Sequence, residues 1–284
     1  MKPVRKAVIP AAGYGTRFLP ATKSIPKEMI PIVDNPVIQY VVEEAIQSGI
    51  EEILIITGHG KRAIEDHFDT NVDLEYHLRH HGKVAMLDMV QEISKINIHY
   101  IRQKHIRGVG DAILCAESFI DNEPFAGDDI IYHEPEPAIH QLMRTYNKCG
   151  ATMVGCQTLK EAQVVPRNII QSVATEEEGI SRFLGAEKAV GHETEGKSAM
   201  LGRYILTPDI FEILRRVQPN KKGKIKLSDA LKLMANRQAV YTCEIKGKRY
   251  DIGNKLDYLK ATVEYALRRP EIKDAFRTYL NQYT

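Results

Sequence analysis

The chain opens with a short hydrophobic run that leads into a turn of small residues. Residues 7–9 are all apolar, and a glycine-containing segment follows them over 10–16. Apolar positions then recur at the spacing of a helix face over 37–46, and Gly49 comes shortly after them. A glycine after such a run is typical of a helix end. The pattern therefore predicts a strand, a turn and an amphipathic helix in that order.

Further along the chain, strand patterns and helix patterns alternate. The run over 52–58 is almost continuously apolar, which is typical of a strand covered on both faces of a sheet. The same patterns predict helices at 61–68, 72–95, 112–120 and 137–148, and strands at 96–103, 151–157, 169–174 and 199–206. This alternation favours an α/β fold with a doubly wound, mostly parallel, Rossmann-like sheet and helices on both faces.

The last part of the chain differs from the rest. Past Asp251 the pattern becomes helical, and it ends in a helix over 271–283. A chain of 284 residues is long enough for one large α/β domain, and no low-complexity linker or internal repeat divides it. We therefore predict an α/β domain over 1–250 and a C-terminal helical segment over 251–284. That segment packs on the same domain or on a partner subunit, and the sequence leaves both open.

Composition and charge exclude several classes of protein. Hydrophobic residues make up 43% of the chain, which is enough for a sizeable core. The formal net charge of +2 gives no reason to expect nucleic acid or an acidic membrane as a partner. The four cysteines show neither the spacing of a metal site nor a disulfide framework. The first apolar run is too short for a signal segment and no apolar run reaches about 18 residues, so we expect a cytoplasmic protein.

The candidate chemistry lies in the turn after the first strand. Glycines there let the backbone approach a ligand closely, and successive N–H groups in such a turn form a concave site for anions. Arg17 and Lys27, with Lys23 between them, add the positive charge that a polyphosphate requires. The spacing matches neither the dinucleotide motif GxGxxG nor the P-loop motif GxxxxGK[ST]. The segment predicts a triphosphate-binding loop at the carboxyl end of a first strand.

The spacing of this segment, G-x-G-T-R followed by x-x-P-x-T-K-x-x-P-K-E-M, is long and specific. It resembles the signature of sugar-1-phosphate nucleotidylyltransferases, in particular the bacterial UTP–glucose-1-phosphate uridylyltransferases. The resemblance implies that glucose 1-phosphate attacks the α-phosphorus of UTP in line, assisted by Mg²⁺, to give UDP-glucose and pyrophosphate. Arg17 and Lys27 are then catalytic residues that hold the triphosphate. The nucleotide-binding residues implied for this segment are Ala11, Ala12, Gly13, Gly15, Thr16 and Glu28.

Two further segments extend the resemblance. Gln103 and Gly108 match the glutamine and glycine that read uracil in this family, and an amide that both donates and accepts suits a pyrimidine edge. Asp111 stands where the family usually has histidine. Asp128, within Gly-Asp-Asp, and Asp251 match the two carboxylates that hold Mg²⁺, a hard cation that shares phosphate oxygens.

The sugar side of the family pattern is altered. Glu187 and Lys188 keep only its two-residue core, which implies a glutamate on the sugar hydroxyls and a catalytic lysine on the sugar phosphate. Arg167 and the asparagine after it replace an expected Tyr-Gly, and Lys224 replaces an expected glutamate. The nucleotide half therefore keeps the family pattern better than the sugar half.

The strand that should precede Asp128 is short. Only residues 124–127 are available for it, although a buried strand normally needs roughly four to eight residues. Either a central strand is truncated, or residues 129–132 take its place and displace the carboxylate along the sheet.

Three functions fit these observations. The first is uridylyl transfer between UTP and glucose 1-phosphate, which makes these two molecules the expected partners. The second is a related transfer that uses dTTP or another sugar 1-phosphate, because uracil and thymine share the edge that Gln103 would read. The third is a nucleotide-binding paralogue that has lost catalysis. The resemblance also implies a homo-oligomer.

Overall fold

The first half of the chain builds a parallel sheet around its first strand. The computed structural model describes residues 2–120, 125–126, 130–132, 136–161 and 163–283. Strand β1 (Lys6–Pro10) runs parallel to β4 (Glu52–Thr57) on one side and to β6 (Phe125–Ala126) on the other. Strand β5 (Ile98–Arg102) lies beyond β4 and is also parallel to it. The loops that follow β1, β4 and β5 therefore meet at one edge of the sheet, as carboxyl ends of parallel strands do.

The second half of the chain closes into a barrel. Beyond β6 the sheet continues through β11 (Ser198–Leu206), β8 (Thr152–Thr158), β12 (Val240–Glu244), β10 (Ile180–Gly191) and β9 (Gln163–Ala174). Strand β9 also pairs with β11, at Ile169 and Ala199, so these five strands form a closed ring. The pairings of β6, β8 and β9 with β11, and of β9 and β12 with β10, are antiparallel. The α/β class is confirmed, but the sheet is mixed and a doubly wound order is not confirmed.

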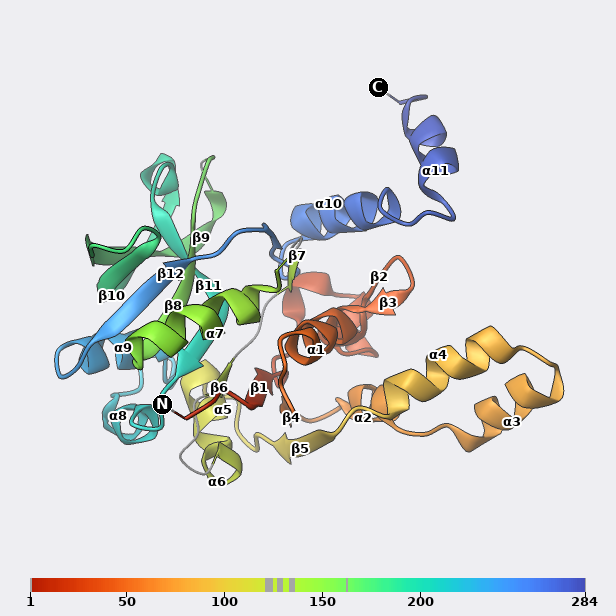
Figure 1. Cartoon of the computed structure of the whole chain (residues 1–284), viewed down its shortest axis with the longest axis horizontal. Helices are drawn as coiled ribbons and strands as arrows, with labels where there is room; N and C mark the ends of the chain where they lie inside the picture. The colour runs from red at the N-terminus through yellow and green to blue at the C-terminus, as the bar shows by residue number, and fades with distance from the viewer. Residues whose placement is uncertain (1, 121–124, 127–129, 133–135, 162, 284) are drawn as a thin grey trace.

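Helices cover both faces of the sheet, because its strands are apolar on both sides (Figure 1). Along β1, Ala7 and Ile9 belong to one hydrophobic core and Val8 belongs to the other. The helices on the first core are α1 (Val37–Gln47), α2 (Arg62–Phe68) and α7 (Ala138–Cys149), together with Ala261 of the C-terminal helical segment. The helices on the second core are α5 (Val109–Cys115), α6 (Glu117–Ile120), α8 (Ile210–Arg216) and α9 (Leu227–Ala235).

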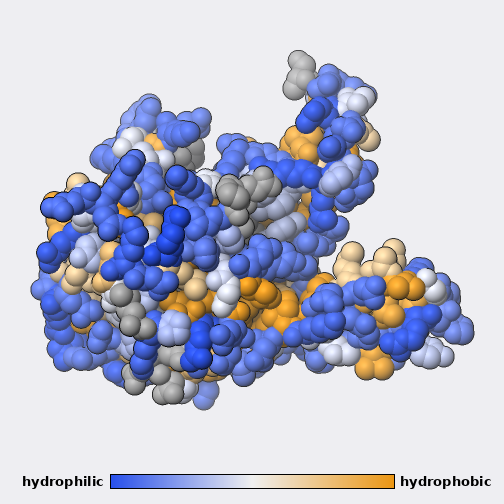
Figure 2. Space-filling model, in the orientation of Figure 1, coloured by the Kyte–Doolittle hydropathy of each residue, from blue (hydrophilic) through white to orange (hydrophobic). Residues whose placement is uncertain are grey.

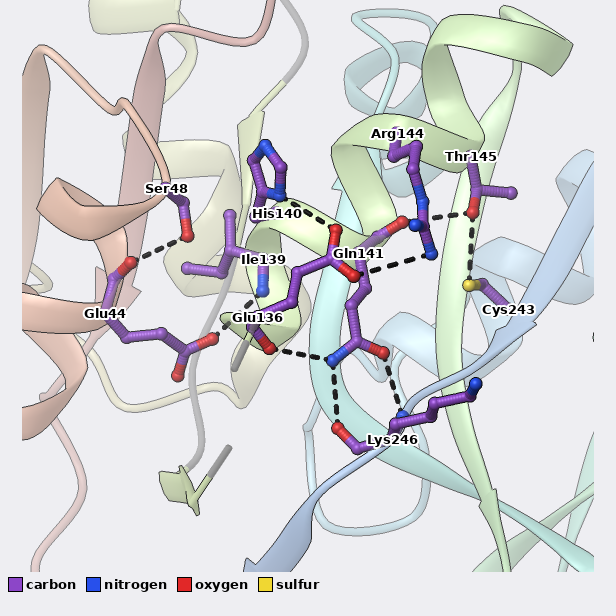
Figure 3. A network of polar contacts seen from close by, with 10 residues as sticks. All are labelled: Glu44, Ser48, Glu136, Ile139, His140, Gln141, Arg144, Thr145, Cys243 and Lys246. Atoms are coloured by element: carbon purple, nitrogen blue, oxygen red, sulfur yellow. Dashed lines mark hydrogen bonds and ion pairs between the residues drawn. The ribbon is translucent and has the colours of Figure 1, made fainter. Parts of the chain in front are cut away.

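A network of polar contacts joins α1 and α7 to the barrel. The Glu44 carboxylate of α1 accepts two hydrogen bonds from Arg203 of β11, at 3.1 and 2.6 Å, and a third from the Ile139 N–H of α7. Gln141 exchanges two hydrogen bonds with the Lys246 backbone just after β12, at 2.9 and 2.8 Å (Figure 3). Both side chains are buried, so Arg203 and Glu44 form an ion pair inside the core in which each charge compensates the other.

Two helical segments project from this body (Figure 1). The first contains α3 (Val72–His80) and α4 (Val84–Ser94), and the second contains α10 (Lys255–Ala266) and α11 (Lys273–Leu280). The remaining elements are β2 (Pro31–Ile32) with β3 (Asn35–Pro36), β7 (Ile130–Tyr132) with β13 (Lys248–Tyr250), and the 3₁₀ helices η1 (Thr16–Phe18), η2 (Ala21–Lys23), η3 (Lys27–Met29) and η4 (His192–Thr194). Hydrophobic side chains gather on the α3–α4 segment in Figure 2, and Val84, Met86 and Met89 are exposed there.

Among the helices that the structure describes, none is both long and apolar enough to span a membrane. The boundary near residue 250, between an α/β domain and a helical segment, stays a prediction. In the structure α10 packs against β13 and β2, so the start of that segment lies on the same chain.

Several predicted elements need correction in detail. The helix expected at 72–95 is interrupted at 81–83, where Gly82 adopts a positive φ of 65°. The helix expected at 112–120 begins earlier, at Val109, and divides into α5 and α6. The strand expected at 169–174 is the second half of β9. The patterns also missed β10, β12, α8 and α9, which complete the barrel and its cover.

The expected truncation of the strand before Asp128 stays a prediction, because residues 124 and 127–129 lie outside the described residues. The described part of β6, Phe125 and Ala126, pairs with Lys6 and Ala7 of β1. The alternative that residues 129–132 replace this strand is wrong for its described part, 130–132. There β7 pairs with β13 in a separate two-stranded sheet.

Candidate active site

The loop after β1 is held by its own backbone and by the chain that returns to it. The Ala11 N–H donates to the Ile56 carbonyl of β4 at 2.8 Å. Gly15 has a φ of +66°, and a Cβ at this position would lie 2.8 Å from the Lys27 Cβ. Both facts require glycine here. The predicted nucleotide-binding positions of this loop are Ala11, Ala12, Gly13, Gly15 and Thr16, and the loop wraps around the Lys27 side chain.

A buried pair of charges lies directly beneath this loop. Glu28 and Lys61 are both almost fully buried, and Lys61 Nζ donates to Glu28 Oε2 at 2.6 Å. Burial lowers the pKa of the Lys61 ammonium, although the Glu28 carboxylate opposes that shift. The other carboxylate oxygen, Oε1, lies 3.5 Å from Lys27 Nζ and has no hydrogen-bond partner among the described residues. Lys61 therefore compensates the charge of Glu28 at Oε2, inside the core, while Lys27 approaches Oε1 from the cavity.

One cavity of about 200 Å³ joins this loop to the turn after β13. It is lined by Ile9, Pro10, Arg17, Lys27, Glu28, Val37, Ile38, Val41, Asp251, Ile252 and Gly253. Arg17 Nη1 also donates to the Gly253 carbonyl at 3.5 Å. The structure therefore brings together Arg17, Lys27, Glu28 and Asp251, which are more than 200 positions apart at the extremes of the sequence.

The Asp251 carboxylate is engaged on both oxygens. Oδ1 accepts the Gly253 N–H at 2.9 Å, and Oδ2 accepts from Arg167 Nη1 at 2.6 Å. Burial would raise the pKa of Asp251, but the Arg249 and Arg167 cations outweigh burial and hold this pKa below its usual range. Arg167 Nη2 also lies 3.7 Å from Asp257 Oδ2. Asp251 is therefore an ionised carboxylate with a cation already beside it.

A second group of polar residues lies at the end of β5. The Gln103 side chain is 4% exposed, and its Nε2 donates to Asp111 Oδ2 at 2.7 Å and to the Gly108 carbonyl at 3.3 Å. Arg107 contacts the other oxygen of Asp111 through Nε at 3.0 Å and Nη2 at 2.8 Å. Gly108 has a φ of +94°, and a Cβ there would lie 2.7 Å from the Ile225 carbonyl oxygen. The backbone packs so closely against Ile225 at this position that only glycine fits.

The two residues expected on the sugar side lie on strand β10 of the barrel. Glu187 is opposite Ile169 and Lys188 is opposite Asn168 on β9. Neighbouring positions of a strand point to opposite faces, so Glu187 lies on the same face of this hairpin as Arg167, and Lys188 on the other. Both side chains are exposed and neither lines the cavity described above.

Of the two carboxylates expected to hold a metal ion, only Asp251 can be evaluated, because Asp128 lies outside the described residues. Among the described residues, each Asp251 oxygen accepts one hydrogen bond, which leaves it a second lone pair. Mg²⁺ typically binds one or two carboxylates and completes its shell with phosphate oxygens and water. Asp251 fits such a site. Within the part of the chain that the structure describes, no cluster of three His, Cys, Asp or Glu side chains could hold a metal alone.

Sequence reasoning missed several side chains that contact the predicted site residues. Lys61 gave no signal, since a lysine at the start of a helix is usually exposed. Arg167 was recognised only as a departure from the family pattern, and its contact with Asp251 spans 84 positions of the chain. A signal for Arg107 was available, because an arginine four residues before an aspartate in a helical start favours an ion pair.

Comparison with known proteins extends the family resemblance to nearly the whole chain. A family model described as nucleotidyl transferase matches residues 6–268. A UTP–glucose-1-phosphate uridylyltransferase 2 of Streptococcus pyogenes serotype M3 is 45% identical over 289 residues, which cover 99% of this chain and 97% of the relative.

Solved structures agree in sequence and in fold. A UTP-bound UGPase from Acinetobacter baumannii is 32% identical, with a TM-score of 0.90, over 99% of this chain and all of that one. A UDP-glucose pyrophosphorylase complexed with UDP-glucose is 40% identical, with a TM-score of 0.83, over 94% of this chain and all of that one. Both structures bind uridine nucleotides, as their descriptions state.

Proposed function

We infer that this chain, which belongs to the nucleotidyl transferase family, is an enzyme that transfers the uridylyl group of UTP to glucose 1-phosphate. The products are UDP-glucose and pyrophosphate. The observation that carries this inference is the cavity in which Arg17 and Lys27 of the glycine-containing loop face the Asp251 turn. Two cations and one ionised carboxylate, brought together from opposite ends of the chain, suit a polyphosphate and its metal ion.

The residues of the first loop bind and position the nucleotide. Arg17 and Lys27 lie against the triphosphate and offset its charge, while the backbone from Ala11 to Thr16 allows its close approach. Gln103 and Gly108 lie at the end of β5 and contact the base. Because the loops after β1 and β5 meet at one edge of the sheet, a single nucleotide can reach both groups.

The sugar phosphate approaches from the barrel. Glu187 contacts sugar hydroxyls, and Lys188 attracts the phosphate of glucose 1-phosphate against the repulsion of the triphosphate. A phosphate oxygen of the sugar then attacks the α-phosphorus in line, and pyrophosphate leaves. No protein nucleophile is needed, so catalysis consists of positioning and of neutralising charge.

Mg²⁺ is the divalent ion that we propose for this site. Asp251 and Asp128 would hold it, and when bound it offsets charge on the phosphate oxygens of both substrates. Arg167 donates a hydrogen bond to Asp251 at 2.6 Å, so its cation competes with the metal ion for this carboxylate.

The deciding experiment measures pyrophosphate release from UTP and glucose 1-phosphate, with Mg²⁺ and with EDTA. Release that requires both the sugar phosphate and the metal supports the proposal. Release with dTTP or another sugar 1-phosphate at a higher rate would reassign the substrate. UTP binding without any release would instead identify a paralogue that has lost catalysis.

Lys27→Ala tests the assignment of the cavity. Removing one such contact commonly costs about 3–4 kcal/mol of transition-state stabilisation, so kcat should fall by a factor of about 10²–10³. Lys83→Ala, at an exposed position between α3 and α4, is the matched control and should leave turnover unchanged. A near-normal rate in Lys27→Ala would refute this role.

A further inference from the structure

The side-chain amide of Gln103 is held in one orientation by two acceptors. Its Nε2 group donates to Asp111 Oδ2 at 2.7 Å and to the Gly108 carbonyl at 3.3 Å. A backbone carbonyl accepts hydrogen bonds and cannot donate them, and the Asp111 carboxylate is an acceptor as well because it forms an ion pair with Arg107. Only the NH₂ side of the amide can therefore face Gly108 and Asp111. The amide oxygen, Oε1, is directed away from both.

Asp111 is itself firmly placed. It is 5% exposed in the first turn of α5, and Arg107 contacts its Oδ1 through two nitrogens. The segment that carries it is fastened to the chain before α9, since the Gly110 N–H donates to the Ile225 carbonyl at 3.1 Å and the Ile225 N–H donates to the Arg107 carbonyl at 2.7 Å. The carboxylate that orients Gln103 is thus fixed by charge and by backbone.

This orientation determines which base edge Gln103 can bind. Uracil presents a donor, N3–H, at the centre of its pairing edge, whereas cytosine presents an acceptor, N3, at the same place. An amide oxygen pairs with the uracil donor and opposes the cytosine acceptor in the same pose. If the amide could turn over, its NH₂ group would donate to N3 of cytosine instead, and the discrimination between the two bases would be lost.

We propose that Asp111 is a positioning residue for base selection: by fixing the Gln103 amide with its oxygen toward the nucleotide, it makes the site prefer UTP over CTP. The proposal rests on the proposed function, in which Gln103 contacts the base. A histidine, which resemblance to the family leads one to expect at position 111, carries one donor and one acceptor nitrogen when neutral and does not force this orientation alone. The aspartate in this chain does.

The test is the ratio of CTP to UTP dissociation constants, measured by calorimetry on the full chain. We expect the wild-type protein to bind UTP about 10–100 times more tightly than CTP, since an opposed buried acceptor costs about 1–3 kcal/mol. In Asp111→Asn the new amide can donate as well as accept, so only the longer contact with the Gly108 carbonyl, at 3.3 Å, still opposes a turned Gln103 amide. The ratio should fall about tenfold or more, while the UTP affinity changes much less.

Two further variants separate positioning from folding. Asp88→Asn makes the same chemical change at an exposed position of α4 and should leave the ratio at its wild-type value. Arg107→Ala releases Asp111 from one side at a largely exposed residue. It should lower the ratio by a smaller factor, and it supplies the test should Asp111→Asn fail to fold. A general loss of structure would weaken the binding of UTP and of CTP by the same factor and leave the ratio of their dissociation constants unchanged.

The outcomes distinguish this proposal from the function on which it rests. Absence of UTP binding to the wild-type protein would overturn the proposed function and this inference with it. Preferential UTP binding that persists unchanged in Asp111→Asn, or in Arg107→Ala where that variant has to serve, would overturn only the inference. A lowered ratio with retained UTP binding supports it.

Discussion

The buried charge pair beneath the first loop leads to a prediction in which stability and substrate binding change together. Lys61 Nζ lies 2.6 Å from Glu28 Oε2, with both side chains less than a tenth exposed. Replacing Lys61 by methionine keeps most of the length of the side chain and removes its charge. Glu28 then remains buried, with Lys27 as the nearest cation that the structure records, at 3.5 Å.

The expected cost follows from this geometry. Removing one partner of a buried ion pair typically costs about 3–5 kcal/mol, because the other charge is left uncompensated in the core. Lys27 offsets part of that cost, but it is 41% exposed and not yet at hydrogen-bond distance. We therefore expect Lys61→Met to lower the free energy of unfolding by about 3 kcal/mol, which corresponds to a Tm lower by roughly 6–12 °C in a chain of this size.

The same variant should weaken the binding of UTP. Once Lys61 is gone, the Glu28 carboxylate attracts Lys27 away from the triphosphate. A charged hydrogen bond contributes about 1.5–3 kcal/mol, so the KM for UTP should rise by a factor of about 10–100. The KM for glucose 1-phosphate, which binds from the barrel side, should change much less.

Urea unfolding and steady-state kinetics measure the two effects. Lys95→Met is the matched control: Lys95 pairs with Glu92 at an exposed position, and such pairs contribute at most about 1 kcal/mol. The double variant of Lys61→Met with Glu28→Gln removes both charges and should recover part of the lost stability. A loss below 1 kcal/mol in Lys61→Met, or a double variant that is less stable than the single one, would refute the reasoning.

Three further predictions follow from the polar contacts. Arg203→Met removes the two hydrogen bonds that the almost fully buried Glu44 accepts from Arg203, and should cost about 3–5 kcal/mol in urea unfolding; a cost near zero would contradict this. Burial raises the pKa of Glu264, but the hydrogen bond from Lys248 outweighs burial, so the pKa lies below 4.5. The stability that this carboxylate contributes is therefore present above pH 4.5 and is lost as the pH falls through the lowered pKa. The difference in unfolding free energy between the wild type and Glu264→Gln should therefore narrow on acidification, and a constant difference would argue against it. Arg167→Ala removes the cation from the adjacent carboxylate and should tighten Mn²⁺ binding, followed by electron paramagnetic resonance, about tenfold; unchanged or weaker binding would exclude competition between the two cations.

The loop after β1 could be predicted from the sequence because its signals are local. The residues from Ala11 to Glu28 lie in one stretch, and the loop that they form is set by glycine positions and by the strand before it. The end of β5 is similar, since Gln103 and Gly108 are five positions apart. Residues that are close in the sequence have few possible relative positions, so a local motif predicts most of the local structure.

The barrel half could not be predicted in the same way. Its strands pair across long stretches of sequence, as β9 does with β11 and β12 with β8, and no local pattern encodes such pairings. The long hairpin of β9 and β10 has register shifts that disturb the alternation by which a strand is recognised. For the same reason the contact between Arg167 and Asp251 was invisible, although each residue had been singled out separately.

Two departures from the family pattern become one feature once the structure is known. Asp111 introduces an acid where the family resemblance implies histidine, and Lys224 introduces a base where it implies glutamate. The segments that carry them lie against each other, since Ile225 hydrogen-bonds to Arg107 and Gly110, and a Cβ on Gly108 would lie 3.4 Å from the Lys224 Cβ. Relative to that pattern, the negative charge next to Gln103 has moved from one segment to its neighbour. Lys224 is therefore weak evidence for a paralogue without catalysis, because the acid missing at its position is present across the contact, bonded to Gln103.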